Sequence, residues 1–123
     1  MATSHAIPRL TARVTLADLF AFGGGIARTG NICGAVSGAL MAIGLKHGRT
    51  KAEDEPAREK TYELTRAFLG RFRQEHGSDI CRELLGVDID TTEGREAAMK
   101  AGLLRSRCPE FVRSAAHIVS TVV

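Results

Sequence analysis

Apolar residues recur every three or four positions along most of this chain, and this helical period constrains the fold more than any other feature. No alternation of apolar and polar residues lasts long enough to indicate a strand. The period is clearest at Ile32, Ala35, Val36, Ala39, Leu40 and Ile43, at Leu64, Phe68 and Phe72, and at Phe111, Ala115, Ile118 and Val122. The sequence therefore predicts an all-α fold, a compact bundle of five or six helices with short Gly-rich connections.

Capping and helix-breaking residues set the expected limits of these helices. Pro56 suits a first helical turn, and Gly77 and Gly86 suit the left-handed residue that follows a helix. We expect one helix from a capping box at Thr15 and Asp18 to Gly23, and others from the Asn31 cap to Gly48, from Pro56 to His76, from the Ser78 cap to Leu85, from Glu93 to Leu104 and from Pro109 to Val122.

Length and charge exclude several classes of protein. A chain of 123 residues favours one domain, so we expect a single helical domain over residues 1–123, with residues 1–14 as a loosely ordered N-terminal segment. The formal charge of +3 comes from dispersed side chains, without the basic stripe of a nucleic-acid binder. Glycine and polar residues dilute the uncharged run between Arg28 and Lys46, so no membrane helix is expected. Three cysteines without a CxxC pair, and no cleavable signal, predict a cytoplasmic protein.

The three cysteines are the main candidates for chemistry, because each lies where a helix is expected to begin. Cys33 follows the Asn31 cap, Cys81 follows the Ser78 cap, and Cys108 directly precedes Pro109. The positive end of a helix dipole favours thiolate over thiol, and Arg82, Arg105 and Arg107 act in the same direction. We therefore expect at least one of the three cysteines to have a lowered pKa.

A thiolate attacks disulfides and binds metals, so this placement suits redox chemistry and metal ligation alike. We expect Cys33, Cys81 and Cys108 to converge, with at least two close enough to share a disulfide or an ion. The alternative interpretation is a structural or protein-interaction module with inert cysteines, because free cysteine is among the most buried residue types.

Glycines surround the first cysteine. Gly30, Gly34 and Gly38 recur at four-residue spacing, which predicts either close helix packing or a floor for a cofactor, with Arg28 bordering it. The glycine-rich stretch over 23–30 lacks the Lys and Ser or Thr of a phosphate-binding loop, because Asn31 and Ile32 follow Gly30.

Three stretches resemble a known family, the redox-active proteins with the pattern C-GCAxxG-C-C. They read "FGGGIARTGNICGAVSGALMAIGLKHGR", "FLGRFRQEHGSDICRELLG" and "RCPEFVRSAAHIV", and the likeness covers roughly residues 15–120. The resemblance implies a helical fold whose cysteines act in redox chemistry or hold an iron-sulfur centre. The resemblance implies that three of the family's cysteines correspond, one by one, to Cys33, Cys81 and Cys108.

The chain departs from the family pattern in two places. The string GCAxxG is absent, the nearest match running from Cys33 to Gly38, and residues 1–14 lack the further cysteine that family members commonly carry. A single chain therefore has no four-cysteine site. A three-cysteine site with another ligand, or one disulfide and a lone thiol, remain as alternatives.

The missing cysteine-bearing helix also bears on assembly. Without it, apolar faces would be exposed around Phe20, Phe22 and the stripe of Phe111, Ile118 and Val122. We therefore expect a homodimer with the C-terminal helix in its interface, together with a redox partner protein whose identity the sequence does not give.

Overall fold

The computed structural model describes residues 20–48, 51 and 53–123. These residues form the 3-10 turn η1 (Phe20–Phe22) and the helices α3 (Gly23–Ile26), α4 (Gly34–His47), α5 (Glu55–His76), α6 (Cys81–Leu85), α7 (Thr92–Lys100) and α8 (Leu103–Val122). The described ranges hold no strand, only an isolated antiparallel bridge between Ile32 and Ile80. The predicted all-α fold is confirmed. None of the helices in these ranges combines the length and apolar character needed to cross a membrane.

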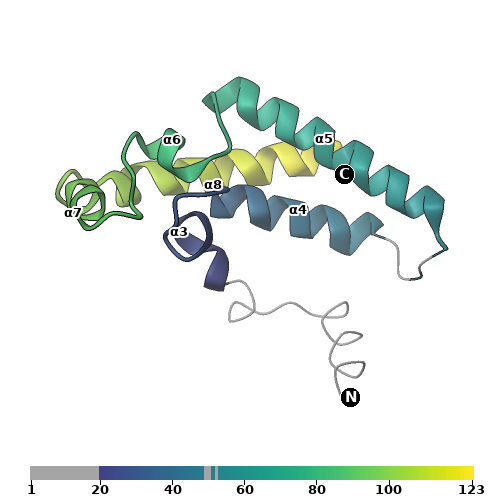
Figure 1. Ribbon diagram of the computed structural model, residues 1–123. Coiled ribbons are helices and arrows are strands. Elements are labelled where there is room, and N and C mark those ends of the chain that lie inside the picture. Colours follow the sequence, from purple (N-terminus) through teal and green to yellow (C-terminus); the bar gives the residue numbers. More distant parts are fainter. Residues whose placement is uncertain (1–19, 49–50, 52) are drawn as a thin grey trace, which may run out of the picture.

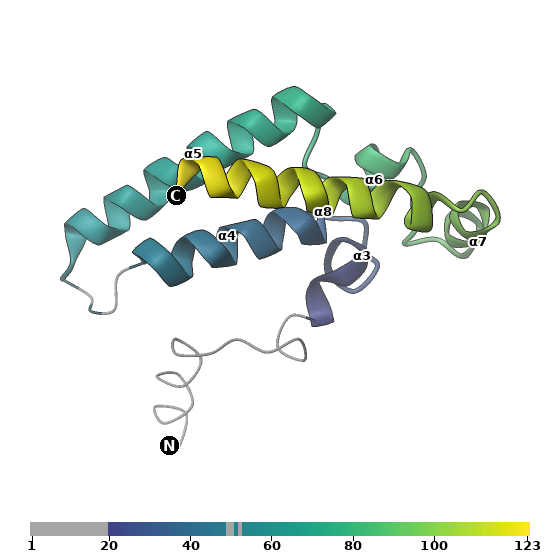
Figure 2. The ribbon, with the colours of Figure 1, turned by 180° about the vertical axis from the view of Figure 1, so that it is seen from behind.

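Three long helices build the body of the molecule (Figures 1 and 2). α4, α5 and α8 pack against one another in all three pairings. α4 and α8 run side by side in the same direction, and α5 returns in the opposite one. The short elements α3, α6 and α7 gather at the end where α4 and α8 begin. The beginnings of several helices therefore meet at one end of the molecule.

Large side chains from the predicted stripes fill the space between the long helices. Val36 and Ile43 of α4, Phe68 and Phe72 of α5, and Ile118 of α8 are completely buried. The Phe72 ring lies 5.9 Å from the Phe68 ring and 6.4 Å from the Phe111 ring, measured between centroids. Burying each such side chain contributes about 1.5–3 kcal/mol, so these contacts fix how the helices pack.

This core contradicts part of the basis for the predicted dimer. Phe111 is 3% exposed and Ile118 is not exposed at all, so these two side chains pack inside the chain, whereas Phe22 and Val122 are half-buried. The large apolar side chains that α8 does expose are Leu104 and Val112, which are 36% and 56% exposed. Phe20 lies where no side chain is described. The homodimer itself stays a prediction.

Both ends of α5 and the C-terminal end of α6 follow the expected chemistry, whereas the start of α6 does not. The Asp54 carboxylate accepts a hydrogen bond from the Ala57 amide at 3.2 Å, with proline in the first turn of α5. Gly77 and Gly86 adopt φ values of +86° and +77° just beyond α5 and α6. Ser78 is not the cap residue of α6, which is Ile80, but its hydroxyl accepts the Ile80 amide at 2.9 Å.

Other predicted helix ends are wrong. α4 begins at Gly34 with Cys33, not Asn31, as its cap residue. The break between the last two helices lies at Gly102, whose φ of +67° ends α7 sooner than expected, and α8 begins at Leu103 with Pro109 inside it. The chain turns at Gly102 because its left-handed conformation cannot continue a right-handed helix, whereas α8 continues through Pro109 although that residue has no amide hydrogen to donate. The capping box at Thr15 and Asp18 and the N-terminal segment 1–14 lie outside the described residues.

Candidate functional site

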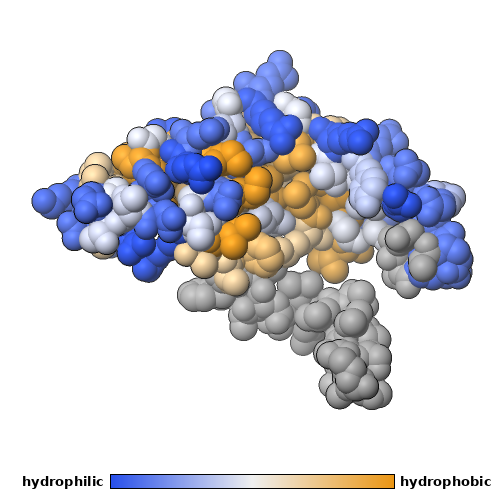
Figure 3. All heavy atoms as spheres, viewed as in Figure 1, coloured by the Kyte–Doolittle hydropathy of each residue, from blue (hydrophilic) through white to orange (hydrophobic). Residues whose placement is uncertain are grey.

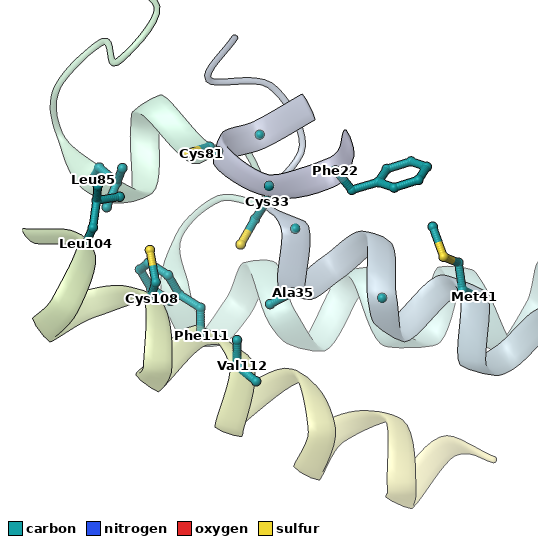
Figure 4. Close-up of a pocket in the computed structure, with 15 residues that line it drawn as sticks. Phe22, Cys33, Ala35, Met41, Cys81, Leu85, Leu104, Cys108, Phe111 and Val112 are labelled. Carbon is teal, nitrogen blue, oxygen red and sulfur yellow. The ribbon is translucent and has the colours of Figure 1, made fainter. Parts of the chain in front are cut away.

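All three cysteines line one apolar cavity of about 310 Å³ at the end of the molecule where the short elements gather (Figure 4). Cys33 comes from the start of α4, Cys81 from the start of α6 and Cys108 from α8. Cys33 and Cys108 project from their helices toward the same space. Among the described residues, the walls carry no charged side chain. Besides the cysteines they consist of Phe22, Gly23, Gly24, Gly25, Gly34, Ala35, Gly38, Met41, Leu85, Leu104, Phe111 and Val112. The fold thus brings together the residues that the sequence singled out.

A short backbone ladder fixes Cys33 and Cys81 relative to each other. The Cys33 amide donates to the Asp79 carbonyl at 2.8 Å, and the Cys81 amide donates to the Asn31 carbonyl at 2.6 Å. The Arg82 amide extends the ladder with a bond to the Gly30 carbonyl at 3.1 Å. Because these bonds satisfy backbone amides at the starts of two helices, the ladder helps to determine where both helices begin.

An ion pair holds the loop that precedes Cys81. The Asp79 carboxylate is buried and accepts hydrogen bonds from Nε and Nη2 of Arg73, each at 2.7 Å. Two charge-assisted bonds to one carboxylate oxygen compensate for its removal from water. The pair connects the C-terminal turn of α5 to the residue whose carbonyl receives the Cys33 amide.

Glycine is required where the α3 segment approaches Cys81. Gly25 has φ +67°, and a Cβ atom added there would lie 2.6 Å from both the Cys81 Cβ and the Asn31 amide nitrogen. The left-handed conformation extends over Gly24, Gly25, Ile26, Ala27 and Arg28, and three of these residues are not glycine. The Thr29 hydroxyl contacts the carbonyl oxygens of Gly25 and Ile26 at 2.7 and 2.8 Å and braces the turn.

The three thiols differ in their relation to the helix starts. Cys33 is the cap residue of α4 and Cys81 is the first residue of α6, as the helix-start hypothesis requires. Cys108 is not at a helix start, because α8 begins five residues earlier at Leu103. The dipole argument therefore does not extend to Cys108, since that effect falls off within the first turn.

Two of the thiols do not have the lowered pKa that was expected of at least one cysteine. Burial raises the pKa of Cys81 to about 11, and negative charge on Cys33 and Cys108 would raise it further. Burial also raises the pKa of Cys108, with Cys33 acting in the same direction and Arg107 opposing both. Burial of the thiolate raises the pKa of Cys108 more than the positive charge of Arg107 lowers it. None of the three cysteines is in a disulfide.

Exposure separates Cys108 from the other two thiols. Cys33 is 8% exposed and Cys81 is 7% exposed, whereas Cys108 is half-buried. The guanidinium of Arg107 lies over the Phe111 ring, 5.5 Å from its centroid, and Phe111 is part of the cavity wall. A positive charge therefore lies at the edge of the cavity next to its most accessible thiol.

The predicted cofactor floor is only partly at the cavity. Gly34 and Gly38 line it, but Gly30 and Arg28 do not. Gly30 faces the Arg82 side chain, because a Cβ added there would lie 3.2 Å from the Arg82 Cβ, and the Arg28 side chain packs over Gly24. The wall residues that were missed include Gly23, Gly24 and Gly25, which the glycine run before Cys33 could have indicated.

The donor set does not suit a metal centre within one chain. Among the residues that the structure describes, no group of three or more His, Cys, Asp and Glu side chains is placed to hold a metal ion. An iron-sulfur cluster usually takes four cysteine thiolates, and the chain has three cysteines. We therefore derive no chemistry through a metal, and consider the three thiols as thiols.

Comparison with known proteins supports a redox assignment. No similar protein was found among curated proteins or among solved structures. A family model described as "Putative redox-active protein (C_GCAxxG_C_C)" matches residues 4–122, nearly the whole length of the chain. With its cysteines gathered at one cavity, the chain belongs to this redox-active C_GCAxxG_C_C family.

Proposed function

We propose that this protein carries out thiol–disulfide exchange, with Cys108 as the attacking thiol and Cys33 as the thiol that completes the disulfide. The observation that carries the proposal is that three unpaired thiols, from three separate helices, line a single apolar cavity. Membership of a family described as redox-active supports the same class of chemistry.

Exposure and charge support Cys108 as the attacking group. It is the most accessible of the three thiols, so a disulfide from solution reaches it first. Arg107 favours its thiolate and opposes the effect of burial on its pKa. An attacking thiol needs both access and a thiolate fraction, and Cys108 has a structural source for each.

Cys33 is the better partner because it lies within electrostatic reach of both other thiols. Its charge raises the pKa of Cys81 and of Cys108 alike, and its effect on Cys81 exceeds that of Cys108. These effects favour Cys33 over Cys81 as the partner of Cys108. In this proposal Cys81 remains reduced and packs the wall of the cavity.

The reaction balances with a disulfide as the oxidant. The Cys108 thiolate attacks one sulfur of a substrate disulfide, forms a mixed disulfide and displaces one substrate thiolate. The Cys33 thiolate then attacks the Cys108 sulfur, forms the Cys33–Cys108 bond and displaces the second substrate thiolate. The two protons lost by the cysteines go to these leaving groups, so two electrons pass from the protein to the substrate.

Mapping of adducts by mass spectrometry tests this sequence, with glutathione disulfide as the probe. In Cys33→Ser we expect the mixed disulfide on Cys108 to accumulate, because the second step has no nucleophile. In Cys108→Ser we expect almost no adduct under native conditions. The matched variant Cys81→Ser is expected to form the Cys33–Cys108 disulfide as the wild type does.

The contrary outcome is a protein whose three thiols react only after denaturation. That result would support the alternative of a structural or protein-interaction module with inert buried cysteines, for which the raised pKa of Cys81 is the supporting observation. A Cys33–Cys81 disulfide as the first product would contradict the assignment of roles while leaving the thiol chemistry intact.

A further inference from the structure

The walls around the three thiols offer a bound molecule apolar contacts and no charge to pair with. They include the side chains of Phe22, Leu85 and Phe111, and no described residue of the wall is charged. The cavity volume of about 310 Å³ lies at the lower end of the range of about 300–1,000 Å³ that is usual for small-molecule sites. A small molecule with apolar groups therefore suits this cavity better than an ion does.

A second apolar hollow, of about 560 Å³, adjoins the thiol cavity along the seam between α4 and α8. The two share Gly34, Ala35, Gly38 and Val112, and the described walls of both are uncharged. A Cβ atom added at Gly38 would meet no described atom within 4 Å, so this shared floor leaves room. Hydrophobic residues also gather over α3 and α4 on the face drawn in Figure 3. Apolar surroundings thus extend from the thiols along α4.

We propose that the substrates that oxidise Cys108 are small, uncharged disulfides with aliphatic or aromatic groups. The inference rests on the proposed thiol–disulfide exchange and adds the class of its substrate. The Cys108 thiolate attacks one sulfur of R–S–S–R, forms Cys108–S–S–R and displaces R–S⁻, which takes up the proton lost by the thiol. The retained R group lies in the cavity until the Cys33 thiolate attacks the Cys108 sulfur and displaces the second R–S⁻.

Arg107 acts in the opposite direction, because a positive charge at the edge of the cavity attracts anions. Its side chain is exposed, with the guanidinium 5.5 Å from the centroid of the Phe111 ring. Water and salt screen an exposed charge, so its effect on binding is about fivefold at most. Moving an ion from water into an apolar cavity without a partner charge weakens binding by at least about a hundredfold. The walls therefore outweigh Arg107 in selecting the substrate.

Glutathione disulfide differs from the proposed class because it carries ionised carboxylates and amines. It still reaches Cys108, since that thiol is only half-buried. Its charged groups stay in water, however, so it gains no binding from the apolar walls. We expect it to react at Cys108 more slowly than an uncharged disulfide of equal intrinsic reactivity.

Alkyl methanethiosulfonates test this class, because each transfers one alkylthio group to a thiol and releases methanesulfinate. The series compares the uncharged methyl and butyl reagents with the sulfonatoethyl anion and the trimethylammonioethyl cation. Mass spectrometry gives the rate at which free Cys108 thiol is lost in the native protein. Dividing it by the rate in urea-unfolded protein removes the intrinsic reactivity of each reagent.

The expected order follows from the apolar walls. The normalised rate of the butyl reagent should exceed those of the anion and the cation at least about tenfold, because both ions must leave water to enter the cavity. It should also exceed that of the methyl reagent by about tenfold, because three more methylene groups are buried.

A charge placed on the wall should reduce this selectivity. Val112 lines the cavity and is already 56% exposed, so Val112→Asp adds a carboxylate there without disturbing the core. We expect it to lower the ratio of the butyl rate to the cation rate at least about fivefold. Ser106→Asp is the matched control, because Ser106 is exposed on the same helix and lines neither hollow. It should change that ratio less than about twofold.

The contrary outcomes separate this inference from the exchange reaction. Equal normalised rates for all four reagents would overturn the inference and leave the exchange reaction in place. A fastest reaction with the anion would also overturn it, and would assign the selectivity to Arg107. Reaction of Cys108 with every reagent only after unfolding would overturn the exchange reaction itself, and this inference with it.

Discussion

At the scale of single residues, the buried thiol of Cys81 links stability to pH. Its pKa is raised from an ordinary value near 9 to about 11. Between these values the folded protein keeps a proton that the unfolded chain has lost, so stability is intact below about pH 9 and falls as pH rises through 11. At about 1.4 kcal/mol per unit, we expect a loss of about 1–3 kcal/mol.

Urea unfolding of the wild type and of Cys81→Ala at pH 8 and pH 10.5 measures this effect. Lysine and tyrosine titration affects both proteins equally, so the difference between them isolates Cys81. The wild type should lose more stability than Cys81→Ala between the two pH values. Equal losses would mean that the Cys81 environment accommodates the thiolate.

Arg107 provides a second prediction at this scale. Because Arg107 lowers the pKa of Cys108, Arg107→Gln should raise that pKa and slow alkylation of Cys108 at neutral pH. Arg107 is exposed, so the effect should be that of a surface charge pair, about two- to fivefold in rate. Arg105→Gln is the control, since Arg105 is exposed on the same helix and does not contribute to the Cys108 pKa.

Iodoacetamide labelling, followed by peptide mass spectrometry, gives the rate at Cys108 as a function of pH. The expected curve for Arg107→Gln is shifted to higher pH with an unchanged plateau. If Arg105→Gln shifts the curve by the same amount, general surface charge rather than Arg107 sets the reactivity of Cys108.

The site residues could be named from the sequence, but their ionisation could not. Cysteine is rare enough in this chain that its three positions stood out, and the fold brings all three to one cavity. The sign of each pKa shift depends on how deeply tertiary packing buries the thiol. That depth cannot be inferred from nearby charges or from the position of helix ends in the sequence. For Cys81, burial outweighs its favourable position at the start of α6.

At the scale of elements, the left-handed stretch from Gly24 to Arg28 brings α3 against Cys81. Each non-glycine residue in this conformation costs roughly 1–2 kcal/mol. Glycine avoids that cost, and at Gly25 the missing side chain also allows the close approach to Cys81. Gly25→Ala combines an unfavourable φ with contacts to Cys81 and Asn31 that are too short. We expect it to lower the free energy of unfolding by about 2–4 kcal/mol.

The neighbouring Gly23→Ala is the matched control for this substitution. Gly23 also lines the cavity, but an added Cβ meets nothing within 4 Å and its φ is not positive. Its urea midpoint should stay within experimental error of the wild type. A Gly25→Ala protein as stable as Gly23→Ala would show that the turn relaxes without disturbing Cys81.

The sequence predicted the existence of the long helices better than their ends. Apolar periods over α4, α5 and α8 are long, and the same residues form the core. The start of α4 was missed because the backbone before Cys33 pairs with residues 79–82, a long-range contact that replaces local capping by Asn31. The end of α7 was missed because the sequence offers two helix-breaking residues, Gly102 and Pro109, and only Gly102 separates two helices.

At the scale of the whole molecule, the proposed disulfide would join the start of α4 to α8. Cys33 and Cys108 are separated by about 75 residues, and a crosslink closing such a loop restricts the unfolded chain by about 4 kcal/mol in the chain-entropy model. We therefore expect the oxidised protein to unfold at higher urea concentration than the reduced protein. Cys33→Ser treated with the same oxidant should show no such difference.

Because the disulfide and folding are thermodynamically linked, the same effect predicts how folding shifts the redox equilibrium of Cys33 and Cys108. If the disulfide stabilises the fold by about 4 kcal/mol, folding must favour the disulfide by an equal amount, which is about a thousandfold in the exchange equilibrium. Titration with reduced and oxidised glutathione in buffer and in unfolding urea measures that ratio. A ratio near one would mean that folding neither favours nor disfavours the bond, whereas a crosslink that lowers the urea midpoint would mean that α4 and α8 must separate to form it. The folded protein would then favour the dithiol state and act as an oxidant toward substrate thiols, with the electrons passing opposite to the direction proposed above.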